Sequence, residues 1–107
     1  MPEYKFSIQP DISAGYLTMH EGEFGRTGQV NPEVFIDYDT SGALMGIEFL
    51  SLESIENFNP DEISSAVKPQ ELAELKMLLG SHLDVKSVVL ESRKQNITEF
   101  TEILISI

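Results

Sequence analysis

An alternating pattern occupies the middle of the chain, in the stretch Val34-Phe35-Ile36-Asp37-Tyr38-Asp39-Thr40-Ser41-Gly42-Ala43-Leu44-Met45-Gly46-Ile47-Glu48-Phe49-Leu50. Apolar residues alternate with other types on both sides of Asp39-Thr40-Ser41-Gly42, whose residue types are typical of a β-turn. Two alternating runs joined by a tight turn are typical of a β-hairpin. The stretch therefore predicts an antiparallel hairpin between residues 34–38 and residues 43–52.

The register of this hairpin can be inferred from its apolar positions. Residues that lie opposite each other in an antiparallel pair share a face of the sheet. A loop of two or four residues gathers the apolar side chains on one face, whereas a three-residue loop would mix them with polar ones. In the favoured register an aromatic ring would also cover a strand glycine. The expected pairs are Val34–Ile47, Phe35–Gly46 and Ile36–Met45.

The residues before the hairpin also alternate with a period of two. Residues 4–8, 15–20 and 26–30 predict three short strands, separated by Pro10-Asp11 and by the Gly-rich segment 21–25. Together with the hairpin they predict an antiparallel β-meander over residues 4–53.

The second half of the chain changes to a helical period. Asn59-Pro60-Asp61-Glu62 is typical of a helix start, with an N-cap, a proline in the first turn and acidic residues after it. Lys68-Pro69 interrupts that helix and starts another, along which leucines recur on one face. We therefore expect two short helices within residues 54–83. The leucines of the second are Leu72, Leu75, Leu78, Leu79 and Leu83.

The C-terminal segment fits either a helix or a strand. Residues 97–107 have apolar residues at helical spacing, but β-branched residues dominate residues 103–107 and favour a strand. Residues 85–90 offer a similar run as a partner, so we expect a C-terminal β-hairpin within residues 84–107. The fold class predicted for residues 1–107 is a single α+β domain.

Composition and charge exclude several function classes. The 107 residues include no cysteine, which excludes disulfides and metal sites built on thiolates. The net charge is −11, and residues 1–62 hold 12 acidic and two basic residues. Such a chain disfavours direct nucleic-acid binding, which needs clustered Lys and Arg. No signal peptide and no membrane-spanning run is recognised, so we expect a cytoplasmic protein.

The turn also matches the spacing of a calcium-binding loop. Asp37, Asp39 and Ser41 would be oxygen ligands, with Gly42 at the sharp bend and Glu48 at the twelfth position. In a hairpin, however, Glu48 would lie roughly 13 Å along the strand from the turn. The favoured interpretation is a turn with solvated carboxylates, and a divalent metal at residues 37–42 is the alternative.

No catalytic set is recognised elsewhere. His20 and His82 are far apart in the sequence, and no serine lies in a Gly-x-Ser-x-Gly motif. We therefore expect no enzymatic activity and no cofactor.

Residues 4–53 resemble the bacterial domain of unknown function family 2283. The similarity is carried by residues 13–19, by Arg26-Thr27 and by residues 34–50. Its most specific part is residues 37–50, with their Asp-Tyr-Asp and Gly-Ile-Glu motifs. Gly15 stands where the family usually has a larger residue, and residues 54–107 extend beyond the usual short tail. The resemblance implies a small antiparallel β-domain of bacterial or phage origin and no established activity. Without the resemblance, the residue types alone indicate structural roles in the turn and in packing for Asp37, Asp39, Gly42 and Gly46.

Three functional hypotheses follow. The first is a non-enzymatic interaction module that binds a protein partner or forms a homodimer, without a membrane or nucleic acid as direct partner. The second is an acidic neutraliser that occupies a basic nucleic-acid-binding surface of another protein, because the acidic residues concentrate in residues 1–62. The third is the divalent-metal site at the turn.

Overall fold

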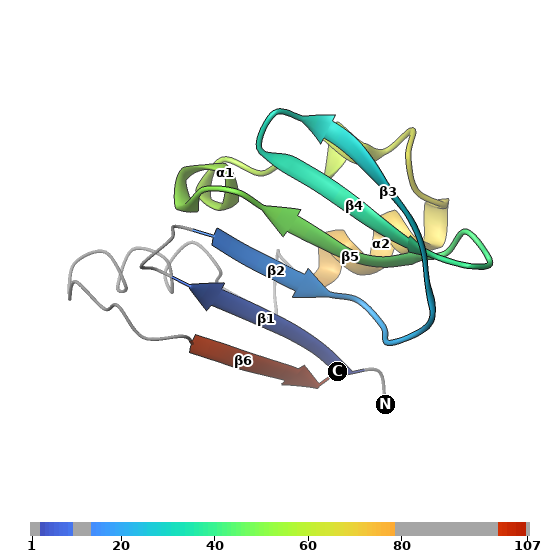
Figure 1. Cartoon of the computed structure of the whole chain (residues 1–107), viewed down its shortest axis with the longest axis horizontal. Helices are drawn as coiled ribbons and strands as arrows, with labels where there is room; N and C mark the ends of the chain where they lie inside the picture. Colours follow the sequence, from blue (N-terminus) through green and yellow to red (C-terminus); the bar gives the residue numbers. More distant parts are fainter. Residues whose placement is uncertain (1–2, 10–13, 79–100, 107) are drawn as a thin grey trace.

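The computed structural model describes residues 3–9, 14–78 and 101–106. Six strands form one antiparallel sheet (Figure 1). The strands are β1 Glu3–Gln9, β2 Ala14–Thr18, β3 Phe24–Asn31, β4 Val34–Asp39, β5 Leu44–Phe49 and β6 Thr101–Ser106. The helical segments are α1 Leu52–Glu56, the 3-10 helix η2 Pro60–Ile63 and α2 Pro69–Met77.

The strands lie in the order β3-β4-β5-β2-β1-β6 across the sheet. All neighbouring pairs are antiparallel, which confirms the predicted α+β class with an antiparallel sheet in the first half of the chain. The order departs from consecutive neighbours at two places, because β5 pairs with β2, which leaves β3 at an edge, and β1 pairs with β6. The two central strands are therefore β5 and β2.

The register of β4 against β5 differs from the predicted one. Ile36 lies opposite Ile47 and Asp37 lies opposite Gly46, whereas the prediction paired Ile36 with Met45. A β-bulge follows Asp37, and Met45 is the extra residue of β5. The predicted register was wrong by two positions. Next to the turn Tyr38 already pairs with Leu44 and not with Ala43, and the bulge, which alternation alone cannot reveal, adds the second shift.

The bulge places the Met45 carbonyl where β2 ends. This carbonyl accepts hydrogen bonds from the backbone N–H groups of Met19, at 2.7 Å, and His20, at 3.2 Å. The shifted register also sets Phe35 opposite Glu48, not opposite Gly46 as predicted. The other predicted pair, Val34–Ile47, is likewise replaced by Val34–Phe49.

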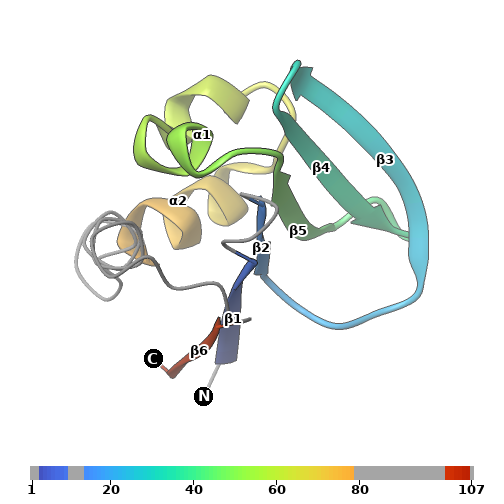
Figure 2. The same ribbon diagram turned by 60° about the vertical axis from the view of Figure 1, so that its left-hand side comes forward.

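The helical segments cover one face of the sheet (Figure 2). Alternation along β1, β2, β4 and β5 buries apolar side chains on that face, and the segment 52–78 supplies the apolar side chains that pack against them. The sheet contributes Tyr4, Phe6, Leu17, Met19, Val34, Ile36, Tyr38, Leu44, Ile47 and Phe49, and the helical layer contributes Ile55, Phe58, Ile63, Leu75 and Leu78.

Two of the helical starts follow the sequence signals. Asn59 caps η2 by accepting a hydrogen bond from the Asp61 N–H at 3.0 Å, and α2 begins at Pro69. α1 was not predicted, because residues 50–52 were assigned to a strand that ends at Phe49. Ser51 caps it, accepting from the Ser54 N–H at 3.0 Å.

Polar contacts also hold the helical layer on the sheet. The Tyr38 hydroxyl donates to the Ala66 carbonyl at 2.8 Å, and the Tyr4 hydroxyl donates to Glu74 at 3.0 Å. Glu71 accepts from the backbone N–H of Leu44, at the start of β5, at 2.8 Å. These bonds satisfy groups at the boundary of the core, where an unpaired donor or acceptor would be destabilising.

The C-terminal strand β6 pairs with β1, with Phe6 opposite Ile103. Residues 101–106 thus form a strand, which the sequence favoured over a helix. The expected hairpin partner, residues 85–90, and the predicted helical residues 79–83 lie outside the described residues.

We expect Leu75→Ala to lower the free energy of unfolding by about 2–5 kcal/mol, because the Leu75 side chain is fully buried between sheet and helices. Leu50→Ala is the matched control, since Leu50 is 44% exposed, and should cost less than about 1 kcal/mol. Urea unfolding of both variants measures the difference. Equal losses would contradict the packing described here.

Candidate functional site

The side of the sheet opposite the helices is called the open face here, and five of its side chains define it. These residues alternate with the core residues along their strands and are partly or fully exposed: Tyr16, Thr27, Phe35, Asp37 and Glu48. They come from β2, β3, β4 and β5, so the open face crosses the central strands. It combines two aromatic rings, two carboxylates and two hydroxyls.

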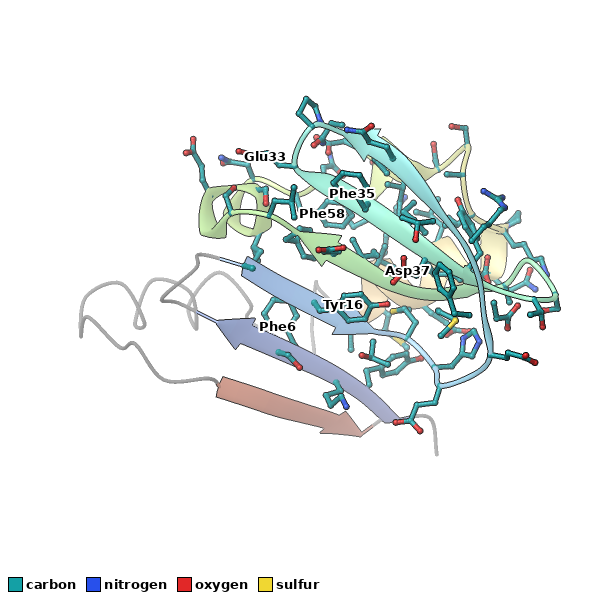
Figure 3. All side chains as sticks on the ribbon, in the orientation of Figure 1. Phe6, Tyr16, Glu33, Phe35, Asp37 and Phe58 are labelled. Carbon is teal, nitrogen blue, oxygen red and sulfur yellow. The ribbon has the colours of Figure 1, made fainter. Side chains whose placement is uncertain are left out.

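A hydrogen-bonded bridge crosses the open face. The Tyr16 hydroxyl donates to Asp37 Oδ2 at 2.7 Å, and the Thr27 hydroxyl donates to Asp37 Oδ1 at 2.7 Å. Figure 3 shows the Tyr16 side chain extending across β5 toward Asp37. The bridge therefore links β2, β4 and β3 without using a side chain of β5.

Gly46 makes this bridge possible. A Cβ atom at position 46 would lie 2.6 Å from Cε1 and Cζ of the Tyr16 ring, closer than real Cβ contacts come. The missing side chain leaves room for the ring, which covers the exposed backbone of β5. The predicted cover of Gly46 by an aromatic ring is thus present, but the ring belongs to Tyr16 and not to Phe35.

The bridge also changes the acid–base behaviour of Tyr16. The pKa of the Tyr16 hydroxyl lies far above its usual value. The largest cause is partial burial, and the hydrogen bond to Asp37 and the negative charges of Asp37 and Glu48 add to it. The phenol therefore stays protonated and keeps donating to Asp37 throughout the physiological pH range.

A second feature of the open face is a row of three residues across β4, β5 and β2. Glu48 lies opposite Phe35 on one side and opposite Tyr16 on the other. Neighbouring strands are about 4.8 Å apart, so the carboxylate has an aromatic residue on each side. Within the described residues, Glu48 has no hydrogen bond and no ion pair.

Asp39 has a different role, at the turn. Its Oδ1 accepts from the N–H and the hydroxyl of Ser41, at 2.9 and 2.6 Å, and from the N–H of Ala43, at 3.0 Å. Its Oδ2 lies 2.9 Å from Nε2 of His20. These contacts, the Ser41 hydroxyl foremost and His20 next, hold the pKa of Asp39 well below its usual range. Gly42 completes the turn with φ +88°.

The predicted metal candidates are therefore placed as follows. Asp37 bonds Tyr16 and Thr27, while Asp39 bonds Ser41 and His20, and the residues of the calcium-loop pattern form two strands and a turn. In residues 3–9, 14–78 and 101–106, no three His, Cys, Asp or Glu side chains gather in a group that could hold a metal ion.

In the same ranges no helix has the length and hydropathy to cross a bilayer.

Two grooves lie beside the helical layer. One, of about 540 Å³, has a lining that includes Tyr4, Met19, His20, Glu71 and Glu74. Both of these glutamates accept hydrogen bonds from the sheet, Glu74 from the Tyr4 hydroxyl and Glu71 from the Leu44 N–H. The other, of about 440 Å³, has three glutamates in its lining, Glu33, Glu53 and Glu62. The first groove is therefore part of the contact between helices and sheet.

Residues 5–52 match the family model described as Protein of unknown function (DUF2283). This match confirms the resemblance seen in the sequence. Neither the search of curated proteins nor the search of solved structures found a match.

The DUF2283 segment, residues 5–52, contains β2 to β5 and most of β1, together with every residue of the open face. The helical layer from Glu53 onward lies beyond the match, yet its buried residues complete the core under the sheet. In this chain, the apolar face of the DUF2283 segment is thus covered by residues that follow it.

Sequence reasoning selected Asp37, Asp39 and Gly46 but missed Tyr16, Thr27 and the Glu48 row as parts of a site. The signal for Tyr16 was present, because alternation with the buried Leu17 places the phenol on the polar face. The contact with Asp37 could not be predicted without the pairing of β2 with β5, which joins residues about 30 positions apart.

A double-mutant cycle tests the contact between Tyr16 and Gly46. Gly46→Ala should lower the free energy of unfolding by about 1–3 kcal/mol, because the new Cβ collides with the Tyr16 ring. In a Tyr16→Ala background the same change should be nearly neutral, which gives a coupling of at least about 1 kcal/mol. Additive losses in urea unfolding would contradict the contact.

Removing the charge of Asp39 should alter the pH dependence of stability. Because the pKa of Asp39 is lower in the folded than in the unfolded chain, its contribution to stability is complete above about pH 5 and is lost as the pH falls. The free energy of unfolding of the wild type should therefore exceed that of Asp39→Asn by less and less as the pH falls from about 5 to about 2. Urea unfolding of both proteins at several pH values measures this difference. A difference in free energy of unfolding that does not vary with pH would contradict the lowered pKa of Asp39.

Proposed function

We propose that this protein is a non-enzymatic protein-interaction module and that its open face is the binding surface. The observation that carries the proposal is the unequal use of the two faces of the sheet. The helical layer of the same chain covers the apolar face, whereas Tyr16, Phe35 and Glu48 on the other face remain partly exposed. A half-exposed aromatic patch on a flat sheet is a common basis for recognition.

The polar candidates of the sequence support a structural role over a catalytic one. The carboxylates of Asp37 and Asp39 accept hydrogen bonds from Tyr16, Thr27, Ser41 and His20, so they hold strands and a turn together. A general acid or base instead needs a carboxyl that can exchange its proton with a substrate.

A second candidate mode is self-association through an edge of the sheet. β3 lies at an edge and its residue Phe24 is 57% exposed. Two register shifts interrupt β3, between Phe24 and Arg26 and between Gln29 and Asn31. Such bulges weaken an edge as a template for strand pairing, which makes the open face the better candidate.

The proposal predicts a saturable protein partner. The full chain, immobilised and incubated with lysate of its own host, should enrich at least one protein that an excess of free chain displaces. A Phe35→Ala, Tyr16→Ala variant should lose it, whereas Met77→Ala, at an exposed position of α2 in the helical layer, should retain it. Light scattering after size exclusion separates self-association from binding of another protein.

Two results would contradict the proposal, one for the interaction module and one for its surface. A chain that is monomeric at low and high salt, and that enriches no displaceable protein, is not an interaction module. A partner retained by the Phe35→Ala, Tyr16→Ala variant would instead move the binding surface away from the open face.

A further inference from the structure

We propose that the open face receives an arginine side chain from a basic segment of a partner protein, at the row Phe35–Glu48–Tyr16. The inference rests on the proposed function, because it names the chemistry of the partner that the open face would bind. Three features carry it: the aromatic neighbours of Glu48, the absence of a cation for this carboxylate, and the charge of the surrounding surface.

The first feature is geometric. Glu48 lies opposite Phe35 on β4 and opposite Tyr16 on β2, so two aromatic residues flank one carboxylate on the same face. The Tyr16 ring is fixed over Gly46 by the hydrogen bond of its hydroxyl to Asp37. A cation above this row would contact a ring face and a carboxylate together, and both attract it.

The second feature is that Glu48 lacks a partner of its own. Among the described residues it makes no hydrogen bond or ion pair, in contrast to Asp37, whose two oxygens accept from Tyr16 and Thr27. Arg26 lies on the other side of the sheet, 4.1 Å from the centroid of the Tyr38 ring. Lys5 is on β1, opposite Thr18, with β2 between it and Glu48.

The Arg26–Tyr38 contact also shows that this chain already uses the same kind of interaction. There an arginine of β3 covers an aromatic ring of the neighbouring strand. On the open face the ring and the carboxylate are supplied, and no cation of the described residues pairs with Glu48. We assign that cation to the partner.

The third feature is electrostatic. Residues 1–62 carry 12 acidic and two basic residues, and they include the five residues that define the open face. This charge attracts a basic segment and repels the phosphates of nucleic acid. Arginine fits better than lysine, because its planar guanidinium can stack on a ring while it donates to a carboxylate.

The test uses the full chain and a hexa-arginine peptide as the probe. Isothermal titration at low salt measures affinity for the wild type, Glu48→Gln and Glu53→Gln. Glu53 is an exposed glutamate on α1, so Glu53→Gln makes the same charge change away from the open face. Glu48→Gln should weaken binding by about fivefold and Glu53→Gln by less than about twofold.

Two further arms complete the experiment. Phe35→Leu keeps an apolar side chain but removes one ring, and it should also weaken binding by about threefold. Hexa-lysine should bind less tightly than hexa-arginine to the wild type. Thermal unfolding of each variant confirms that the variants are folded at the temperature of the titration.

Several results would overturn the inference. Equal losses in Glu48→Gln and Glu53→Gln would indicate general charge attraction without a site, and equal binding of the two peptides would remove the arginine preference. No binding of hexa-arginine would refute the basic partner altogether. If the host partner is still captured by Glu48→Gln with unchanged affinity, the interaction module stands and the arginine site does not.

Discussion

The Tyr16 ring can cross β5 only because residue 46 has no side chain. A Cβ at that position would overlap the ring, and with it the hydrogen bond from Tyr16 to Asp37 would be lost. This bond joins β2 to β4 across β5, and the Thr27 hydroxyl, which also donates to Asp37, extends the link to the edge strand β3. Two hydroxyls thus tie these strands together on the polar face, and that of Tyr16 depends on a glycine beneath its ring.

The bulge at Met45 is what brings Gly46 to this place. Without the extra residue, the register next to the turn, with Tyr38 opposite Leu44, would continue and set Gly46 opposite Ile36, so Tyr16 would meet a different residue of β4. The bulge in turn is held by the N–H groups of Met19 and His20, which directly follow β2 and bond to the Met45 carbonyl. Strand order, bulge and bridge are thus mutually dependent, and all three lie within the residues that match the DUF2283 family model.

The parts of the fold that depend on local chemistry could be predicted from the sequence. The Asp39 turn, the proline at the start of α2 and the alternation of β4 each have a signal within a few residues. The pairing of β2 with β5 has no local signal, so the register, the role of Tyr16 and the Phe35–Glu48–Tyr16 row could not be found. α1 was missed because its five residues follow directly on a strand and are too few for a periodic pattern.

The division of the two faces has a functional consequence. The DUF2283 segment ends at residue 52, and the residues that cover its apolar face come after it in the same chain. The apolar face is therefore used for folding, and the polar face, on which Glu48 has no hydrogen bond or ion pair within the described residues, is the surface that we propose for recognition. On that proposal, the charge of the first 62 residues favours a basic partner.

The central claim, that Tyr16 lies over Gly46 because Asp37 and not Phe35 is opposite that glycine, can be tested directly by nuclear magnetic resonance. Nuclear Overhauser effects should connect the Tyr16 ring protons to the Gly46 α-protons, and the ring should shift one α-proton upfield. A cross-strand contact between Ile36 and Ile47 should accompany them. Contacts from the Phe35 ring to Gly46, with none from Tyr16, would contradict the register and the bridge together.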